Sequence, residues 1–580
     1  MKIDFHCSEK TVRFWSQRTS WMIGSCCLNK TETKMKMKSA SCKAKSNQGK
    51  NKPQVQAVGI FLASLTIAGC GGGGDSGNSN VYGVSFSSNT EQVSCESLMG
   101  TTVAGGKVVS AAAVPAGNYT PSGESAAITG LPAFCRTTVL MRPSVDSNVN
   151  VEIWMPRQDW NGRYLATGNG GGAGSIAYVT GLVEGLKRGF AVANTDLGMS
   201  PSASQQNDHP ERWADFGYRA NHEMTVAGKT LISAYYKAAP RSSYFSGCST
   251  GGQQALSIAQ RYPQDYNGII AGSAANNRTH VHTAFLTNLK ALTAPGTQMS
   301  KDQLDLVTSK VLAACVGKDG GAPTDNFLTD PRQCNFDPET LPKCSGTSDN
   351  SCLTTPQLTA LKTFWKGPIN PRTGERIFAG NPFGTEGSIF GASFLSQPAA
   401  VASQLYMFNW ALGDKWNYAT FDSDQDMDAV DARLALILNA NDPDLTPFKI
   451  AGGKVMMYSG VADAGVPFAE NLAYYERVVQ AQGGDLASTQ SFFRYYLIPG
   501  MGHCSSSTGG NGPGDFGQAY SSIVPKNQEN DIVLKMVDWV ESQKAPDSFI
   551  ATKYADARGT SVALERPICT YPKIPKYQGG

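Results

Sequence analysis

The sequence predicts an α/β fold, in which a parallel β-sheet is flanked by helices and interrupted by a large insertion. First, short apolar or β-branched segments are bounded by glycine or polar turns, a pattern typical of buried parallel strands. Second, helix-compatible runs alternate with these segments. Third, this alternation fails between residues 276 and 445, where cysteines, prolines, glycines and scattered tryptophans replace it. The predicted strands are residues 163–167, 189–194, 243–246, 268–271, 454–459 and 492–498.

These patterns divide the chain into successive parts. Residues 1–69 are predicted to be a leader, and residues 70–85 a flexible tether. Residues 86–275 and 446–580 are predicted to form the two parts of one α/β core. The insertion between them, residues 276–445, is predicted to be a lid domain.

The overall composition suits a folded, soluble body. The chain has 580 residues, of which 41% are hydrophobic and 17% charged, so a disordered chain is excluded. The formal net charge is +3, but the leader is basic and the remainder mildly acidic. A nucleic-acid partner is therefore not expected, because phosphate binding needs a concentrated basic face. No stretch reaches the roughly 18 to 20 apolar residues that span a bilayer, which excludes a polytopic membrane protein.

The N-terminal region has the features of an export signal. Basic residues up to Lys52 precede an apolar run, 57–68, which ends in Gly69-Cys70 and a glycine-rich stretch. The small residues before Cys70 resemble a bacterial lipobox, so Cys70 is predicted to be lipidated and to become the first mature residue. The alternative is ordinary secretion with cleavage near Gly69. We therefore expect an exported protein, either a periplasmic or outer-membrane lipoprotein attached through Cys70 or a secreted one.

Export would place the cysteines in an oxidising compartment, where they are candidates for disulfides. Because the basic region is unusually long, Met35 or Met37 is an alternative start, and the leader cysteines are not expected in the folded protein. Four pairs of the remaining cysteines would leave one over. The leader cysteines are Cys7, Cys26, Cys27 and Cys42; those after Cys70 are Cys95, Cys135, Cys248, Cys315, Cys334, Cys344, Cys352, Cys504 and Cys569.

Residues 247–251 form the sequence's only Gly-x-Ser-x-Gly motif, centred on Ser249. A predicted strand leads into the motif and a helix-compatible run, 253–261, follows it. This context indicates a sharp strand-to-helix turn that exposes a nucleophilic serine, with glycines where a Cβ would clash. The alternative is a glycine-rich turn with an incidental serine.

A nucleophilic serine needs a histidine base oriented by a carboxylate. His503 follows a predicted strand through a tight turn, and Asp463 follows another strand through a short loop, so both should stand at the carboxyl edge of the sheet. The order Ser249, Asp463, His503 matches the α/β-hydrolase order and therefore predicts an α/β-hydrolase core with a large inserted lid domain. Other candidates are His209, His222, His280 and His282, in polar or inserted segments, and Asp442 and Asp444, in an Asp-Pro-Asp turn.

Two cysteines flank the proposed nucleophile and base. Cys248 directly precedes Ser249, and Cys504 directly follows His503. A disulfide between them would also bring the serine and the imidazole within hydrogen-bonding range, because both interactions need short separations. The alternative is that each cysteine pairs elsewhere.

At these residues the sequence resembles the tannase and feruloyl esterase family, from about Cys95 to Cys569. The cysteine-flanked serine and histidine are the most specific part of this resemblance. It implies an α/β-hydrolase core, a lid inserted before the aspartate strand, and activity on esters of aromatic carboxylic acids. The phrases that carry it include Trp160-Asn-Gly-Arg163, residues 215–224, 243–252 and 261–272, Tyr474-Tyr-Glu-Arg-Val478 and Pro499-Gly-Met-Gly-His-Cys504.

The resemblance also implies roles for individual residues. Ser249 would attack the ester carbonyl, His503 would transfer the proton and Asp463 would orient the imidazole. The backbone N–H groups of Thr250 and Gly171 would form the oxyanion hole; for the glycine run 168–174 the alternatives are a flexible loop or a phosphate cradle. Further disulfides implied are Cys95–Cys135, Cys315–Cys334 and Cys344–Cys352, which leaves Cys569 without a partner.

Members of the family often bind calcium in the lid, and the matching loop here offers Asp319, Asp325, Asp330 and backbone carbonyls such as that of Phe327. The loop departs from the family pattern, because Val316 stands where an aspartate is usual and about two extra residues separate the two aspartates. The alternative is a solvated acidic turn closed by Cys315–Cys334. No cofactor is expected for catalysis.

The sequence therefore predicts an exported serine esterase that cleaves feruloyl-type or galloyl-type esters, with a small aromatic ester as its partner. Alternatives are a terephthalate monoester hydrolase of the same family, for which no lid arginine is evident, an acyl transferase, and an inactive surface-tethered binding protein. Phe408, Trp410 and Trp416 of the lid are candidates to stack on the acyl group, although packing in the core is the commoner role of such residues. The pattern does not predict an oligomeric state.

Overall fold

The computed structural model describes residues 4–8 and 92–579, except residues 347, 348, 522 and 526. The chain divides into two structural units, and one of them, Thr11–Asn80, lies outside the described residues. The predicted tether, Cys70 and most of the predicted leader also lie outside the described residues. The predictions about export and lipidation therefore stay predictions.

The core is a ten-stranded sheet with the order β13-β12-β11-β10-β8-β9-β7-β6-β3-β2. Its first six strands are parallel, and each corresponds to one of the predicted segments. All seven residues of β10 are buried, as expected for a strand covered on both faces. The parallel strands are β8 (Arg163–Thr167), β9 (Ala191–Thr195), β10 (Ser242–Cys248), β11 (Gly268–Gly272), β12 (Lys454–Gly460) and β13 (Phe493–Ile498).

The other half of the sheet is antiparallel and was not among the predicted strands. β9 pairs antiparallel with β7, and β6, β3 and β2 continue the sheet in the same way. These strands are β2 (Thr102–Val103), β3 (Gly106–Val114), β6 (Phe134–Met141) and β7 (Val149–Pro156). Two small antiparallel sheets join β4 (Gly117–Tyr119) to β5 (Ile128–Leu131), and β14 (Ser548–Tyr554) to β15 (Val562–Cys569).

Helices cover both faces of the parallel half. Successive strand residues point to opposite faces, so Phe245 packs in one apolar cluster and Tyr244 in the other. The first cluster contains residues of α3, α4 and α13, and the second contains residues of α15. The bounds of the core helices are α1 (Glu184–Lys187), α2 (Pro210–Ala214), α3 (Ala220–Tyr236), α4 (Thr250–Arg261), α12 (Thr446–Ile450), α13 (Phe468–Ala481), α14 (Leu486–Gln490) and α15 (Ile532–Ser542).

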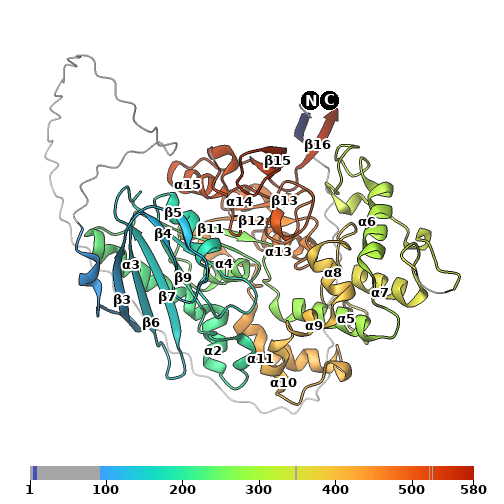
Figure 1. The fold of residues 1–580 in the computed structure, drawn as a ribbon, viewed down its shortest axis with the longest axis horizontal. Coiled ribbons are helices and arrows are strands. Elements are labelled where there is room, and N and C mark those ends of the chain that lie inside the picture. Colours follow the sequence, from blue (N-terminus) through green and yellow to red (C-terminus); the bar gives the residue numbers. More distant parts are fainter. Residues whose placement is uncertain (1–3, 9–91, 347–348, 522, 526, 580) are drawn as a thin grey trace, which may run out of the picture. The chain divides into compact units, whose positions relative to one another are not determined.

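The insertion is helical and contributes no strand to the ten-stranded sheet. Its helices gather together, apart from β3, β6 and β7, in the green-to-orange part of Figure 1. Within the described part of the chain, no helix has the length and apolar character needed to cross a membrane. The helices of the insertion are α5 (Arg278–Thr293), α6 (Lys301–Cys315), α7 (Thr355–Lys366), α8 (Ile389–Ser396), α9 (Pro398–Ala402), α10 (Tyr406–Leu412) and α11 (Gln425–Leu438).

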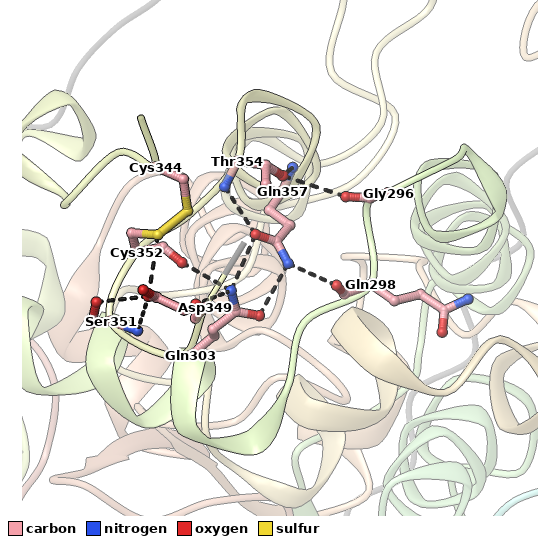
Figure 2. The surroundings of a disulfide bond; sticks show 9 residues. All are labelled: Gly296, Gln298, Gln303, Cys344, Asp349, Ser351, Cys352, Thr354 and Gln357. Atoms are coloured by element: carbon pink, nitrogen blue, oxygen red, sulfur yellow. Dashed lines mark hydrogen bonds between the residues drawn. A yellow bond between two sulfur atoms is a disulfide. The ribbon is translucent and has the colours of Figure 1, made fainter. Parts of the chain in front are cut away.

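Two capping boxes and a disulfide organise the lid around α6 and α7. Ser300 and Gln303 cap the start of α6, and Thr354 and Gln357 cap the start of α7 in the same reciprocal way. Gln303 Nε2 also donates a hydrogen bond to the carbonyl oxygen of Cys352, at 2.8 Å (Figure 2). Because Cys352 is bonded to Cys344, the two helix starts and the disulfide loop hold one another in place.

An N-terminal strand corrects two expectations from the sequence. Strand β1 (Asp4–Ser8) pairs antiparallel with β16 (Ile574–Gly579), and Cys7 forms a disulfide with Cys569. The expectation that Cys7 has no place in the folded protein, and that Cys569 has no partner, is therefore wrong for this structure. The sequence pattern did not reveal this pair, because Cys7 and Cys569 are 562 positions apart and, unlike Cys248 and Cys504, do not flank a predicted catalytic residue.

Candidate active site

Ser249 lies on a strained turn between a strand and a helix. β10 ends at Cys248 and α4 begins at Thr250, and Ser249 has a φ of 63°, which is uncommon for a residue other than glycine. A Cβ on Gly247 would lie 2.5 Å from the carbonyl oxygen of Gly251, so glycine is required for this close approach. The local geometry is that of a nucleophile elbow, which presents the serine hydroxyl above the carboxyl end of the sheet.

Asp463 and His503 form a buried pair in the loops that follow β12 and β13. His503 Nδ1 lies 2.8 Å from Asp463 Oδ2, and the Asp463 side chain is fully buried. The other carboxylate oxygen, Oδ1, accepts hydrogen bonds from the backbone N–H groups of Gly465 and Val466, at 2.8 and 2.9 Å. With both oxygens engaged, the carboxylate can hold the imidazole in one orientation.

The Cys248–Cys504 disulfide is present, with its two Cα atoms 5.9 Å apart. It joins residues separated by 256 positions and lies immediately beside the serine on one side and the histidine on the other. Ser249 and His503 line the same cavity. The bridge therefore brings the two side chains together from distant parts of the chain.

Gly171 and Thr250, whose N–H groups were predicted to form an oxyanion hole, lie in contact beside the serine. Thr250 Oγ1 donates a hydrogen bond to the carbonyl oxygen of Gly171, at 2.7 Å, and both residues line the cavity. Gly171 has a φ of +56°, which favours glycine at this position. A Cβ on Gly170 would lie 2.2 Å from the hydroxyl oxygen of Tyr520, so this loop is tightly enclosed.

The cavity that contains Ser249 and His503 has a volume of about 420 Å³, within the range of small-molecule sites. Three lid phenylalanines, Phe285, Phe390 and Phe394, line it. The Phe390 ring meets the His503 ring edge to face at 4.8 Å between centroids. An apolar wall of aromatic rings next to the serine suits a flat aromatic group.

Several polar lid and loop residues on the cavity wall were not assigned from the sequence. Arg278 and His282 lie one turn apart on α5, and burial, together with the nearby charge of Arg278, lowers the pKa of His282 well below its usual value. Burial raises the pKa of Tyr520 to about 12, so its hydroxyl stays protonated near neutral pH. The only available signal was the Arg-Thr-His-Val-His run at the start of the insertion, which no pattern connects to the serine.

The lid aromatics proposed from the sequence pack elsewhere. Trp410 is stacked on Trp213 with 5.7 Å between ring centroids, and Phe408 packs against Trp416 and Phe421. None of Phe408, Trp410 and Trp416 is among the residues that line the cavity. Their role is packing, the commoner of the two interpretations.

The residues considered for calcium do not fit a calcium site as they are arranged. Asp319 accepts hydrogen bonds from the backbone N–H groups of Gly321 and Thr329, and burial raises its pKa. Asp325 forms an ion pair with the guanidinium of Arg566, at 2.7 Å, so the charge of this carboxylate is already balanced by a cation of the protein. Phe327 is buried with its ring against Gly500. Across the described residues, no group of three or more His, Cys, Asp or Glu side chains is placed to hold a metal ion.

The remaining predicted disulfides are also bonded in the structure. Cys95–Cys135 joins the segment before the sheet to β6, and Cys315–Cys334 and Cys344–Cys352 close loops within the lid. Together with Cys248–Cys504 and Cys7–Cys569, five disulfides are present among the described residues.

Comparisons with known proteins agree on one family. The family model described as "Tannase and feruloyl esterase" matches residues 135–580. An uncharacterized esterase of Xanthomonas campestris pv. campestris is 36% identical, over 83% of this chain and 88% of its own length. A protein named probable feruloyl esterase B-2 of Aspergillus terreus is 32% identical, over 77% of this chain and 83% of its own length. The crystal structure of feruloyl esterase B from Aspergillus oryzae superposes with a TM-score of 0.76 at 29% identity, covering 83% of this chain and 95% of that one.

Proposed function

Because the chain belongs to the tannase and feruloyl esterase family, and is therefore a carboxylic ester hydrolase, we propose that it hydrolyses esters of aromatic carboxylic acids by a serine mechanism. The observation that carries the proposal is the buried Asp463–His503 pair, joined to Ser249 through the adjacent Cys248–Cys504 disulfide. A serine hydroxyl is a weak nucleophile near neutral pH, and this arrangement supplies the base that it needs.

In the proposed reaction, Ser249 Oγ attacks the ester carbonyl while His503 Nε2 accepts the hydroxyl proton. Asp463 holds the Nδ1 proton of the imidazole and stabilises the imidazolium that forms. The tetrahedral oxyanion accepts hydrogen bonds from the N–H groups of Gly171 and Thr250. His503 then protonates the leaving alcohol. In the second half of the reaction water takes the place of the alcohol: His503 accepts a proton from the attacking water and then returns it to Ser249 Oγ as the carboxylic acid leaves. The proposed reaction uses no cofactor.

The cavity supports an aromatic acyl group as the substrate class. The rings of Phe285, Phe390 and Phe394 give one wall an apolar, flat surface, and the volume of about 420 Å³ is enough for a substituted aromatic acid. Two of the relatives in the comparison carry the name feruloyl esterase. We therefore propose hydroxycinnamate or gallate esters as substrates.

We further propose that the protein is exported and anchored through a lipidated Cys70. The proposal is supported by the basic region, the apolar run 57–68 and the small residues before Cys70. Cleavage before Cys70 would remove β1 and its disulfide to Cys569. Intact mass of the purified protein therefore tests this proposal: a mass that begins at an acylated Cys70 supports it, and a chain that retains Cys7 contradicts it.

The proposed activity is tested by labelling and substrate hydrolysis. A fluorophosphonate probe is expected to label Ser249 in the folded protein, and Ser249→Ala is expected to lose both the label and the hydrolysis of methyl ferulate and methyl gallate. An unlabelled, inactive wild type would instead indicate a binding protein. Preference for the terephthalate monoester, or transfer of the acyl group to an added alcohol in place of water, would contradict the proposed substrate class or the hydrolytic reaction, respectively.

A further inference from the structure

Arg278 is a buried cation beside the proposed oxyanion hole. It is the first residue of α5, where the inserted lid begins, and it is only 4% exposed. Arg278 lines the same cavity as Ser249, Gly171 and Thr250. The mechanism derived above gives this residue no role.

The guanidinium donates hydrogen bonds to both segments that form the proposed oxyanion hole. Its Nη1 donates to Thr250 Oγ1 at 2.7 Å, and its Nη2 donates to the carbonyl oxygen of Gly171 at 3.1 Å. Thr250 and Gly171 are 79 positions apart, and the Thr250 hydroxyl also donates a hydrogen bond to the Gly171 carbonyl oxygen. A planar guanidinium can hold two acceptors in a fixed relation, which a single hydroxyl cannot do as rigidly.

A lid residue also accepts a hydrogen bond from the guanidinium. Nη2 also donates to the hydroxyl oxygen of Tyr406, at 2.6 Å, and Tyr406 is the first residue of α10. Arg278 therefore joins three segments: the glycine-rich loop, the residue after the serine and a lid helix. The lid would then support the site where charge develops as well as the wall that contacts the acyl group.

The charge of Arg278 has no carboxylate partner among the described residues. All of its hydrogen-bond acceptors are neutral oxygens, and it forms no ion pair with any described Asp or Glu. Burying a cation without a counter-ion is costly, so the presence of a buried arginine at this point indicates a use for the charge. A negative charge that develops nearby in a water-poor site would be stabilised by it.

We propose that Arg278 is a positioning residue of the oxyanion hole, which fixes the N–H groups of Gly171 and Thr250 and stabilises the tetrahedral intermediate through its unpaired charge. The inference rests on the proposed serine mechanism. It predicts that Arg278 acts on the transition state and has little effect on the binding of the ground-state ester.

The decisive variant is Arg278→Met, with Arg278→Lys as the version that keeps the charge but lacks the planar pair of donors. Removing one oxyanion donor commonly lowers kcat by about 10²- to 10³-fold, so we expect Arg278→Met to lower kcat by at least about 100-fold. We expect Arg278→Lys to retain at least about tenfold more activity than Arg278→Met. Arg433→Met, which removes an exposed lid arginine outside the cavity, is the matched control and should keep wild-type kcat.

Binding measurements separate this role from substrate binding or folding. Phenylboronic acid forms an anionic tetrahedral adduct with a reactive serine, and its affinity should fall in Arg278→Met by the same factor as kcat/KM. The dissociation constant of methyl ferulate, measured in the Ser249→Ala background, should change less than threefold when Arg278→Met is added. Melting temperatures show whether each variant is folded.

Three outcomes would overturn the inference. The first is a kcat of Arg278→Met within threefold of wild type. The second is a loss of methyl ferulate affinity as large as the loss of kcat. The third is equal activity of Arg278→Lys and Arg278→Met, which would show that the charge has no role. Failure of the proposed function itself would look different. In that case wild-type protein would not react with the fluorophosphonate probe, whatever residue occupies position 278.

Discussion

Asp463→Asn changes one atom of the carboxylate that holds His503, and the structure specifies what the new amide would do. The backbone N–H groups of Gly465 and Val466 both donate to Asp463 Oδ1, at 2.8 and 2.9 Å. An asparagine must turn its carbonyl oxygen toward these two donors, which leaves its NH₂ group facing His503 Nδ1. The imidazole would then accept a hydrogen bond at Nδ1 and carry its proton on Nε2.

In that tautomer His503 cannot accept the proton of Ser249. The corresponding change in a Ser-His-Asp triad lowers kcat by about 10⁴-fold, equivalent to about 5 kcal/mol of transition-state stabilisation. Because the backbone hydrogen bonds are kept, we expect KM and the melting temperature to change little. Asp463→Ala should differ by also lowering the melting temperature, since it leaves two buried N–H groups without an acceptor.

The assay is hydrolysis of methyl ferulate under saturating substrate, with the melting temperature measured in parallel. Asp442→Asn is the matched control, because Asp442 was one of the two rival carboxylates and its side chain accepts a hydrogen bond from the backbone N–H of Asp444. A loss of less than tenfold in kcat for Asp463→Asn, or an equal loss for Asp442→Asn, would refute the assignment of the acid.

Four further outcomes are expected. Replacing both cysteines of the Cys248–Cys504 bridge by serine should lower the free energy of unfolding by up to about 5 kcal/mol according to the chain-entropy relation. This loss is about twice that expected for the Cys344–Cys352 bridge of the lid, whose cysteines are only 8 positions apart. Equal melting temperatures for the two double variants would contradict this prediction. Gly170→Ala should lower kcat because its Cβ would meet the Tyr520 hydroxyl, and Tyr520→Phe should partly restore it; no rescue in the double variant would exclude this clash. Burial opposes protonation of His280, but its hydrogen bond to Asp431 and the nearby negative charges outweigh burial and raise its pKa. The stabilisation that protonated His280 gives the fold is complete below about pH 6.5 and is lost as the pH rises through the folded pKa. His280→Gln should therefore lower the melting temperature at low pH, and this difference from wild type should shrink toward pH 9. Chelation or addition of calcium should leave the melting temperature unchanged, and a rise with calcium would show that the lid loop binds it.

Local sequence patterns were enough to locate much of the core. The six parallel strands and the turn around Ser249 each depend on neighbouring residues: an apolar run, a glycine where a Cβ would clash, and a helix-compatible run that follows. The order of Ser249, Asp463 and His503 along the chain, and the cysteines beside two of them, then indicated which loops meet. Among the antiparallel strands that were not predicted, β3, which lies next to the two-residue edge strand β2, mixes buried and exposed residues irregularly.

Only the tertiary structure decided which residues surround the serine. Arg278 approaches Gly171 across 107 positions. The phenylalanines of the cavity wall come from two lid helices, Phe285 from α5 and Phe390 and Phe394 from α8, and no spacing in the sequence connects these helices to the serine. The same holds for Arg566, which neutralises Asp325 across 241 positions in the loop considered for calcium. Residues close in the chain are constrained by backbone geometry, and their pattern is therefore readable from the sequence. Contacts between distant segments depend on how the whole chain packs, and in this protein these contacts build the cavity around Ser249.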